Sequence, residues 1–135
     1  MAKKKILVVD DERNLVDLIK LRLQANNYQV LAAYDGRQGL DLARNEKPDL
    51  IILDLMLPKI DGYKLCRLLK FDEKYQHIPV IMFTARTQEC DKKLGEEVGA
   101  DAYIVKPFDP DALLLKIEAL LREEKADVYG KKSRY

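Results

Sequence analysis

The sequence predicts an α/β fold in which five βα units build one doubly wound parallel sheet. Five short apolar runs alternate with longer segments whose apolar residues recur at helical spacing. Two of these runs, residues 6–9 and 50–53, are apolar throughout, which is typical of strands that are buried on both faces of a parallel sheet. The 135 residues of the chain are enough for one domain of this kind.

The strands are expected where the apolar runs are too short for helices and are bounded by turn residues. These runs are residues 6–9, 28–33, 50–53, 80–83 and 102–105. Parallel strands that are joined by helices require right-handed crossovers, with helices on both faces of the sheet. We expect the flavodoxin-like strand order 2-1-3-4-5.

The first three helices are predicted from apolar spacing and from end signals. The first covers residues 14 to about 26 and contains four apolar residues at helical spacing: Leu15, Leu18, Ile19 and Leu23. The second follows a turn signal at Asp35-Gly36, is marked by Leu40 and Ala43, and ends before Pro48. Pro58 and Asp61-Gly62 indicate a loop before the third helix, at residues 63–71, whose inward residues are expected to be Leu65, Leu68 and Leu69.

The last two helices differ in their apolar content. The fourth, at residues 88–98, is charge-rich, contains Gly95 and ends at Gly99-Ala100, so we expect it to be the element that is easiest to displace. The fifth begins at Pro110 and has five residues on one apolar stripe: Leu113, Leu114, Ile117, Leu120 and Leu121. Because the stripe stops at Arg122, residues 1–122 are expected to form the domain, and residues 123–135 a frayed helix end with a polar tail or linker.

Composition and charge argue against several classes of function. The net charge of +1 indicates neither nucleic acid nor a membrane surface as a partner, and no stretch approaches the roughly 18 apolar residues of a membrane span. The first residues contain no secretory signal, and Cys66 and Cys90 lack metal-type spacing, so two reduced, buried thiols in a cytoplasmic protein are expected. His77, the only histidine, is expected in a solvent-facing loop, and nothing supports a hydrolase triad.

Polar side chains follow four of the predicted strands, at the points where the strands end. They are Asp10, Asp11, Asp54, Thr84 and Lys106. Because the carboxyl ends of parallel strands lie along one edge of the sheet, we expect these side chains to converge there. Three carboxylates, a hydroxyl and an ammonium can together hold a hard divalent cation and a phosphoryl group.

Asp54 follows the central strand and can be a metal ligand, a nucleophile or only a helix cap. Three neighbouring carboxylates repel one another, so they need a cation or a raised pKa. Mg²⁺ prefers oxygen ligands, and with its charge partly masked Asp54 could attack a phosphorus centre and form an aspartyl phosphate. Lys106 adds a positive charge for a phosphoryl oxygen, and a cis peptide at Lys106-Pro107 would aim the ammonium inward. Thr84 offers a hydroxyl, and the small Ala85 leaves its backbone N–H open to close approach.

Together, these segments resemble the receiver domain of bacterial two-component response regulators from residue 4 to about residue 122. The resemblance rests on Ile6-Leu7-Val8-Val9-Asp10-Asp11-Glu12, Asp54 with Leu57-Pro58 and Asp61-Gly62, Thr84-Ala85, Gly99-Ala100-Asp101, and Lys106-Pro107-Phe108. It implies a phosphorylation-dependent signalling switch with Mg²⁺ as its cofactor. It also implies a sensor histidine kinase or a phosphotransfer protein as partner.

The resemblance further implies a role for each matching residue. Asp54 would be the phosphoacceptor, and Asp11 would hold Mg²⁺ with Asp54 and with Asp10, directly or through water. The ligand set would be completed by the backbone carbonyl of Met56, and phosphoryl oxygens would be contacted by Lys106, Thr84 and the backbone of Ala85. The switch would consist of Thr84, which moves toward the phosphoryl group, and Tyr103, which turns inward when Thr84 moves.

Two other classes of protein fit the sequence less well. The alternative on a related α/β fold is an Asp-nucleophile phosphohydrolase of the haloacid dehalogenase type, which requires an acid two residues after the nucleophile, where this chain has Met56. A flavodoxin requires a phosphate-binding loop after the first strand, where the acidic residues Asp10-Asp11-Glu12 would repel a flavin phosphate. We therefore expect no enzyme activity beyond the domain's own phosphorylation and dephosphorylation.

The output is expected to use the face formed by the fourth helix, the fifth strand and the fifth helix. This face would control a partner or an output domain, and could form a homodimer when Asp54 is phosphorylated, because it contains charges of both signs. No binding of nucleic acid by this domain itself and no contact with a membrane are expected.

Overall fold

The structure is a computed structural model that describes residues 3–84 and 99–127, and side chains at 3–83 and 99–122. Five parallel strands form one sheet in the order β2-β1-β3-β4-β5. The strands are β1 (Lys5–Val9), β2 (Gln29–Ala33), β3 (Leu50–Asp54), β4 (Val80–Thr84) and β5 (Ala102–Val105). The predicted fold class and strand order are therefore confirmed.

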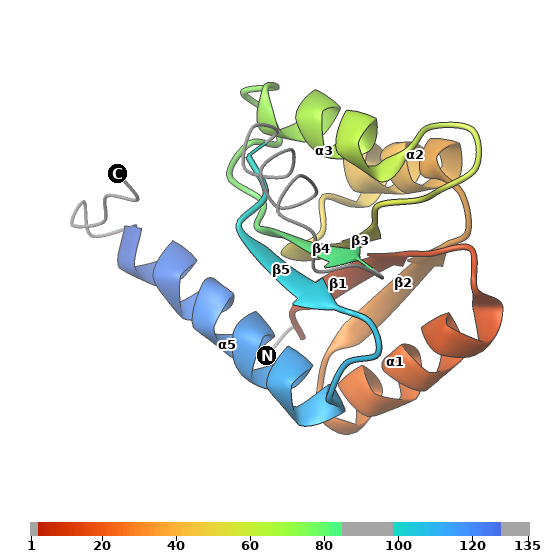
Figure 1. The fold of residues 1–135 in the computed structure, drawn as a ribbon. Helices are drawn as coiled ribbons and strands as arrows, with labels where there is room; N and C mark the ends of the chain where they lie inside the picture. The colour runs from red at the N-terminus through yellow and green to blue at the C-terminus, as the bar shows by residue number, and fades with distance from the viewer. Residues whose placement is uncertain (1–2, 85–98, 128–135) are drawn as a thin grey trace.

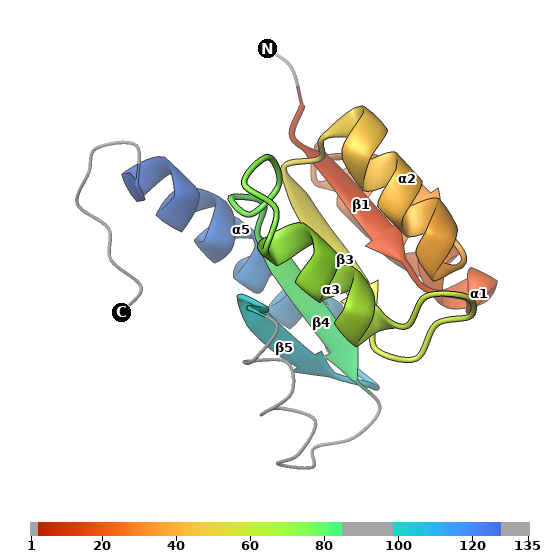
Figure 2. The ribbon, with the colours of Figure 1, turned by 90° about the horizontal axis from the view of Figure 1, so that it is seen from above.

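Helices cover both faces of the sheet, as the crossover rule predicts. They are α1 (Arg13–Ala25), α2 (Gly36–Glu46), α3 (Gly62–Lys70) and α5 (Pro110–Asp127). Figures 1 and 2 show α2 and α3 on one face and α1 and α5 on the other. The helix predicted at residues 88–98 lies outside the described residues. Within the described ranges, no helix is long and apolar enough to cross a membrane.

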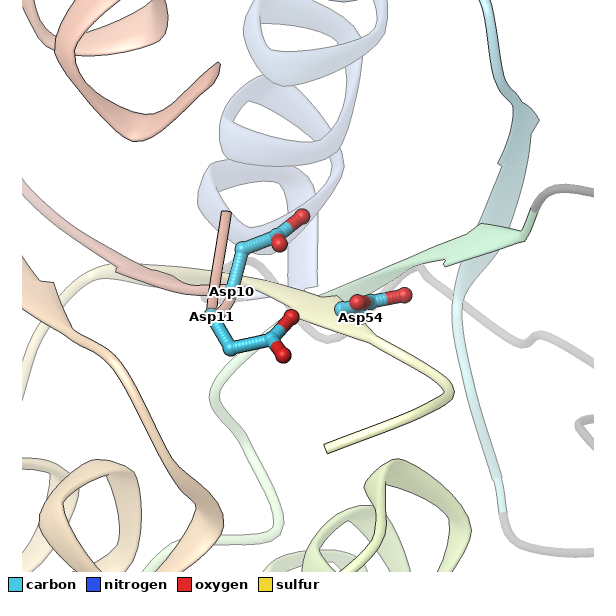
Figure 3. A group of neighbouring side chains, drawn as sticks. All are labelled: Asp10, Asp11 and Asp54. Atoms are coloured by element: carbon cyan, nitrogen blue, oxygen red, sulfur yellow. The ribbon is translucent and has the colours of Figure 1, made fainter. Parts of the chain in front are cut away.

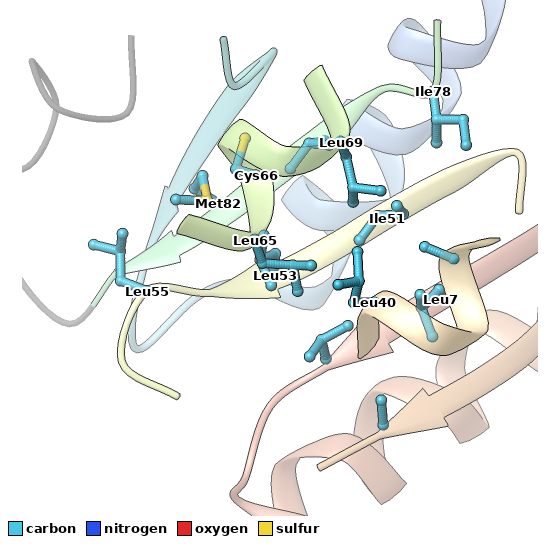
Figure 4. Packing of buried hydrophobic residues seen from close by; sticks show 14 residues of the cluster. Leu7, Leu40, Ile51, Leu53, Leu55, Leu65, Cys66, Leu69, Ile78 and Met82 are labelled. Carbon is cyan, nitrogen blue, oxygen red and sulfur yellow. The ribbon is translucent and has the colours of Figure 1, made fainter. Parts of the chain in front are cut away.

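The core consists of two apolar layers, one on each face of the sheet. Along β1 and β3, alternate residues such as Leu7 and Ile51 point toward α2 and α3, while their neighbours Val8 and Ile52 point toward α1 and α5. Figure 4 shows the first of these layers. Residues 6–9 of β1 and 50–53 of β3 are buried, which explains why these segments are continuous apolar runs.

Two leucines of the predicted apolar spacing are exposed: Leu68, which was expected to face inward, and Leu18. Leu18 of α1 is 66% exposed and Leu68 of α3 is 39% exposed, while Val16 and Cys66 are buried. Each helix has only one buried stripe, and in α1 this stripe passes through Val16, Ile19 and Leu23. A leucine next to such a stripe extends the apolar spacing in the sequence without being covered by the sheet.

Two predicted turn signals are helix starts in the structure. Asp35 and Asp61 are N-caps, and their carboxylates accept hydrogen bonds from the backbone N–H groups of Gln38 (2.8 Å) and Lys64 (2.9 Å). The glycine after each of these caps is the first residue of α2 or α3. The fifth helix, α5, continues to Asp127, past Arg122, where its apolar stripe was expected to stop and a helix end to follow. Strong helix formers in residues 123–126 explain this extension.

A buried ion pair ties together the edge of the sheet that lies opposite the strand carboxyl ends. The ammonium of Lys70, the last residue of α3, lies 2.7 Å from the carboxylate of Asp101. It also donates to the backbone carbonyls of Gln76 (3.1 Å) and Ile78 (2.7 Å). Asp101 in turn accepts a hydrogen bond of 2.8 Å from the backbone N–H of Val80. The end of α3, the start of β4 and the residue before β5 are therefore held at one point.

The cysteine and histidine predictions are tested in part. Cys66 is buried in the layer under α3, and burial raises the pKa of its thiol to about 12, so the thiol stays protonated. Cys90 lies outside the described residues. His77 is exposed in the segment between α3 and β4, as expected.

Candidate functional site

Three carboxylates meet at the carboxyl edge of the sheet. Asp10 and Asp11 follow β1, and Asp54 is the last residue of the neighbouring strand β3. One oxygen from each carboxylate can be chosen so that all lie within 4.8 Å of one another. Figure 3 shows the side chains of Asp11 and Asp54 extending toward the same space, with Asp10 beside them. The predicted convergence of these three residues is therefore present in the structure.

Asp10 is the most buried of the three carboxylates, and both of its side-chain oxygens accept hydrogen bonds. It is 1% exposed, and its backbone N–H donates to the carbonyl of Ala33 at 3.1 Å. One carboxylate oxygen accepts from the backbone N–H of Glu12 at 2.9 Å, and the other accepts from the ammonium of Lys106 at 2.8 Å. Asp11, by contrast, is exposed and is therefore the carboxylate of this group that is most accessible from solvent.

Asp54 is less well compensated than Asp10. It is 8% exposed, its nearest contact with the Lys106 ammonium is 3.6 Å, and its bond from the Met56 backbone N–H is 3.5 Å long. Burial and the negative charge of Asp10 raise the pKa of Asp54 to about 6, although Lys106 and the Met56 N–H act in the opposite direction. The positive charge of Lys106 therefore compensates the buried Asp54 carboxylate only in part.

Lys106 is positioned by the turn that follows β5. The Lys106-Pro107 peptide bond is cis, the geometry that the sequence analysis considered for aiming the ammonium inward. Burial lowers the pKa of Lys106, but its hydrogen bond to Asp10 and the charge of Asp54 outweigh burial, so the net shift is upward. The ammonium also lies 5.8 Å from the centre of the Phe83 ring. Lys106 is therefore a permanent positive charge at the edge of the site.

The donor set fits a hard divalent cation. Asp10, Asp11 and Asp54 offer only carboxylate oxygens, which Mg²⁺ prefers, and water-accessible Asp11 leaves room for further oxygen ligands. The raised pKa of Asp54 indicates that a bound cation would relieve unfavourable charge at this place. Met56 lies in the loop after β3 and is 79% exposed.

Three further predicted site residues are described to different degrees. Thr84 is the last residue of β4 and pairs with Val105, while its side chain and the whole of Ala85 lie outside what the structure describes. Tyr103 of β5 is half-buried and packs against the apolar layer under α2 and α3. The predicted movement of Thr84 and Tyr103 is not tested by a single conformation.

The loop between β3 and α3 contains features of the site that the sequence did not predict. Gly62 follows this loop and lies against the backbone of Asp54, while Gly36 of α2 lies against the backbone of Ile60 within the loop. The Asp-Gly dipeptides at residues 35–36 and 61–62 were visible in the sequence. Nothing in that signal revealed that both glycines contact the same loop.

An apolar groove of about 270 Å³ lies beside Lys106, between α1 and the segment that leads into α5. Its lining includes Leu18, Pro107, Phe108 and Leu113. The exposed Leu18 is therefore part of a surface that reaches the cis Lys106-Pro107 turn at the edge of the site.

Comparison with known proteins agrees with this geometry. Residues 6–118 match the response regulator receiver domain family. The chain is 47% identical over 119 residues to the alkaline phosphatase synthesis transcriptional regulatory protein PhoP of Bacillus subtilis, which covers 88% of this chain and 49% of that protein. The chain spans about half the length of the curated relatives it matches.

Solved structures share the fold over nearly their whole length. A CheY-like response regulator receiver domain protein from Methanospirillum hungatei has a TM-score of 0.88 and 32% identity, over 93% of this chain and 99% of that one. The receiver domain of a sensor histidine kinase from Pseudomonas aeruginosa, with magnesium coordinated in its active-site cleft, has a TM-score of 0.82 and 28% identity, over 89% of this chain and 98% of that one. On the family match over residues 6–118 and the identity to PhoP, this chain belongs to the response regulator receiver domain family.

Proposed function

We propose that this chain is a phosphorylation-dependent switch in which Asp54 takes a phosphoryl group from a phosphohistidine of a sensor histidine kinase or phosphotransfer protein. The observation that supports this most strongly is the position of Asp54. It is a buried carboxylate at the end of the central strand, next to two other carboxylates and 3.6 Å from a lysine ammonium. A carboxylate used only as a helix cap would be bonded to backbone N–H groups of the next helix, whereas the described cap of α3 is Asp61.

The transfer balances without any further reactant except water. An oxygen of the ionised Asp54 carboxylate attacks phosphorus, the P–N bond of the phosphohistidine breaks, and its electron pair stays on the imidazole nitrogen, which takes up a proton from water. Lys106, whose ammonium lies 3.6 Å from the Asp54 carboxylate, would contact one phosphoryl oxygen, and Thr84 with the Ala85 backbone would contact others. Such a domain catalyses only its own phosphorylation and the later hydrolysis of its aspartyl phosphate.

Magnesium is the cofactor that suits this site. Asp10, Asp11, Asp54 and the backbone carbonyl of Met56 would hold it, and the related Pseudomonas receiver contains magnesium in its cleft. When bound, Mg²⁺ supplies positive charge for the phosphoryl oxygens. The carboxylate of Asp10 accepts hydrogen bonds from the Glu12 backbone N–H and the Lys106 ammonium, and these bonds would fix its orientation toward the metal.

The response to phosphorylation is proposed to use Thr84, Tyr103 and the face that residues 88–98, predicted to be helical, would form with β5 and α5. Tyr103 is half-buried on β5, which is an edge strand of the sheet that the described residues form. Lys116 and Glu118 are exposed residues of α5 and offer both charge signs for a two-fold contact. This face would control a partner or form a homodimer.

A further part of the proposal concerns the rest of the protein. Because the curated relatives are about twice as long as the matched region, we propose that residues 1–122 act as the receiver and that the end of α5 and residues 123–135 lead to an output domain or partner. PhoP of Bacillus subtilis is a transcriptional regulatory protein, and DNA binding by a following domain would fit this arrangement. The receiver itself would bind no nucleic acid.

The direct test is phosphorylation by a small donor. The protein is incubated with acetyl phosphate and Mg²⁺, and its intact mass is compared with that of Asp54→Asn and of a control, Asp17→Asn, which changes an exposed acid of α1. We expect one added phosphoryl group on the native protein and on the control and none on Asp54→Asn. Labelling of Asp54→Asn at the native rate would overturn the assignment of the phosphoacceptor.

A further inference from the structure

We propose that Gly36 and Gly62 are positioning residues that fasten the loop of residues 55–61 in the place that the metal and phosphoryl site requires. This inference rests on the proposed function of Asp54 and assigns a role at that site to the start of α2, which contributes no ligand. The loop begins directly after Asp54 and contains Met56, whose backbone is proposed to reach the metal. Both glycines act through their contacts with backbone atoms and not with the substrate.

Gly62 leaves no room for a side chain beside Asp54. A Cβ atom at this position would lie 2.1 Å from the carbonyl oxygen of Asp54 and 2.7 Å from the Cα atom of Leu55. The N–H of Gly62 also donates to the carbonyl of Leu55 at 2.8 Å. Because both neighbours are backbone atoms, they cannot rotate away, and any side chain would have to push the end of β3 aside. That displacement would move the Asp54 carboxylate with it.

Gly36 makes the same kind of contact from the other side of the loop. A Cβ atom here would lie 1.9 Å from the carbonyl oxygen of Ile60 and 2.7 Å from its carbonyl carbon. The N–H of Gly36 donates to the carbonyl of Pro58 at 3.1 Å. An ion pair of 3.6 Å between Lys59 and Asp35 crosses the same junction. The first turn of α2 is therefore attached directly to the loop.

Close approach, and not backbone flexibility, is the reason that these positions require glycine. Among the described glycines, only Gly99 has a positive φ, so the backbone at Gly36 and Gly62 is open to any residue. Within the loop, Lys59 has a φ of 70°, so the turn itself is tight and has little freedom to relax. A side chain at either glycine must therefore be accommodated by movement of the loop.

Gly39, one turn further along α2, provides a matched control. A Cβ atom there would lie 2.9 Å from Val9 Cγ1 and 3.2 Å from Leu65 Cδ2, which are side-chain atoms of the core. Gly39→Ala thus adds the same methyl group to the same helix but presses on rotatable side chains. It is expected to change stability without displacing the loop.

The test compares Gly36→Ala, Gly62→Ala and Gly39→Ala by two measurements. The first is amide hydrogen exchange in the metal-free protein, read by NMR at Leu55, Met56, Ile60 and residue 62. The second is the Mg²⁺ dissociation constant of the folded protein. We expect faster exchange at these amides and about tenfold weaker Mg²⁺ binding in the first two variants, with both values unchanged in Gly39→Ala.

A second variant covers the case in which Gly36→Ala does not fold. Asp35→Ala removes the N-cap bond and the partner of Lys59 but adds no atoms near Ile60, so we expect a smaller change in the same direction. Native exchange and Mg²⁺ binding in a folded Gly36→Ala protein would overturn the proposal, and so would native values in Asp35→Ala if Gly36→Ala does not fold. If the wild-type protein exchanges as expected but acetyl phosphate never labels it, the proposed function fails while the loop assignment stands.

Discussion

Lys106 lies closer to Asp10 than to Asp54, the residue proposed to accept the phosphoryl group. Its ammonium is 2.8 Å from the Asp10 carboxylate and 3.6 Å from that of Asp54. Among the described side chains, Lys106 is the only cation in ion-pair contact with Asp10 or Asp54. Its shorter contact is with Asp10, so Asp10 receives the stronger interaction. The Lys106 ammonium therefore balances the negative charge of Asp10 and leaves that of Asp54 only partly balanced, and the pKa of Asp54 is raised to about 6.

This distribution of charge predicts that the metal-free protein becomes more stable when Asp54 loses its charge. The pKa of Asp54 is about 6 in the folded protein and near its ordinary value of 3.8 when unfolded, so its contribution is favourable at low pH and is lost as pH rises through 6. Asp54→Asn imitates the neutral form. We expect its free energy of unfolding at neutral pH in EDTA to exceed the native value by about 1–2 kcal/mol, since water at the edge of the site screens part of the shift.

Urea unfolding at two pH values separates this effect from a general gain in packing. The advantage of Asp54→Asn should shrink at about pH 4, where Asp54 is protonated in the folded native protein too. A variant that is less stable than the native protein at neutral pH would show that Asp54 is adequately compensated without a metal.

Magnesium should reverse the same imbalance. Because Mg²⁺ binds the folded site and not the unfolded chain, it should raise the free energy of unfolding, by about 2.7 kcal/mol at 100 times its dissociation constant. Asp11→Ala should remove most of this gain, because Asp11 is the solvent-facing member of the acidic group. Thermal melting with and without Mg²⁺ measures the gain. Asp17→Ala, which removes an exposed acid of the nearby helix α1, is the control. An equal Mg²⁺ gain in Asp11→Ala would exclude Asp11 as a ligand.

The ion pair at the opposite edge of the sheet predicts a loss of stability that leaves the site intact. Lys70→Ala removes the ammonium that pairs with Asp101 and with two backbone carbonyls, while Asp101 keeps its bond from Val80. A buried carboxylate that loses its cation typically costs about 3–5 kcal/mol. Urea unfolding of Lys70→Ala and of the exposed control Lys74→Ala measures the cost. Mg²⁺ affinity should be unchanged in both, and a loss of affinity in Lys70→Ala would mean that the two edges of the sheet are coupled.

Much of the fold could be predicted from the sequence because parallel strands that are buried on both faces appear in it as continuous apolar runs. The continuous apolar runs of β1 and β3 and the polar residues that end the strands predicted both the sheet order and the meeting of Asp10, Asp11 and Asp54. The exposure of Leu18 and Leu68 could not be predicted, because helical spacing does not tell which side of a helix the sheet covers.

The contacts within the site were also beyond sequence reasoning. The Lys106–Asp10 bond joins residues 96 positions apart, and either aspartate at the ends of β1 and β3 was an equally good partner by pattern alone. The roles of Gly36 and Gly62 depend on distances to backbone atoms of residues that no local motif identifies. Local patterns thus predict which side chains gather at the edge but not which of them touch.

The last prediction separates docking of a kinase from the chemistry at Asp54. Leu18 is 66% exposed and lines the apolar groove that reaches Pro107 and Phe108 beside Lys106, so a kinase domain that brings phosphohistidine to Asp54 is expected to cover it. Replacing it by a charge should disturb docking without touching the site.

We expect Leu18→Lys to slow phosphotransfer from a purified phosphorylated kinase about tenfold, since a buried apolar anchor of an interface is typically worth more than 1 kcal/mol. Labelling by acetyl phosphate should proceed at the native rate. The matched control is Leu115→Lys on α5, which is equally exposed at 66% but does not line this groove. Equal slowing by both variants would indicate a nonspecific effect of added charge, and native phosphotransfer in Leu18→Lys would place the kinase on another surface.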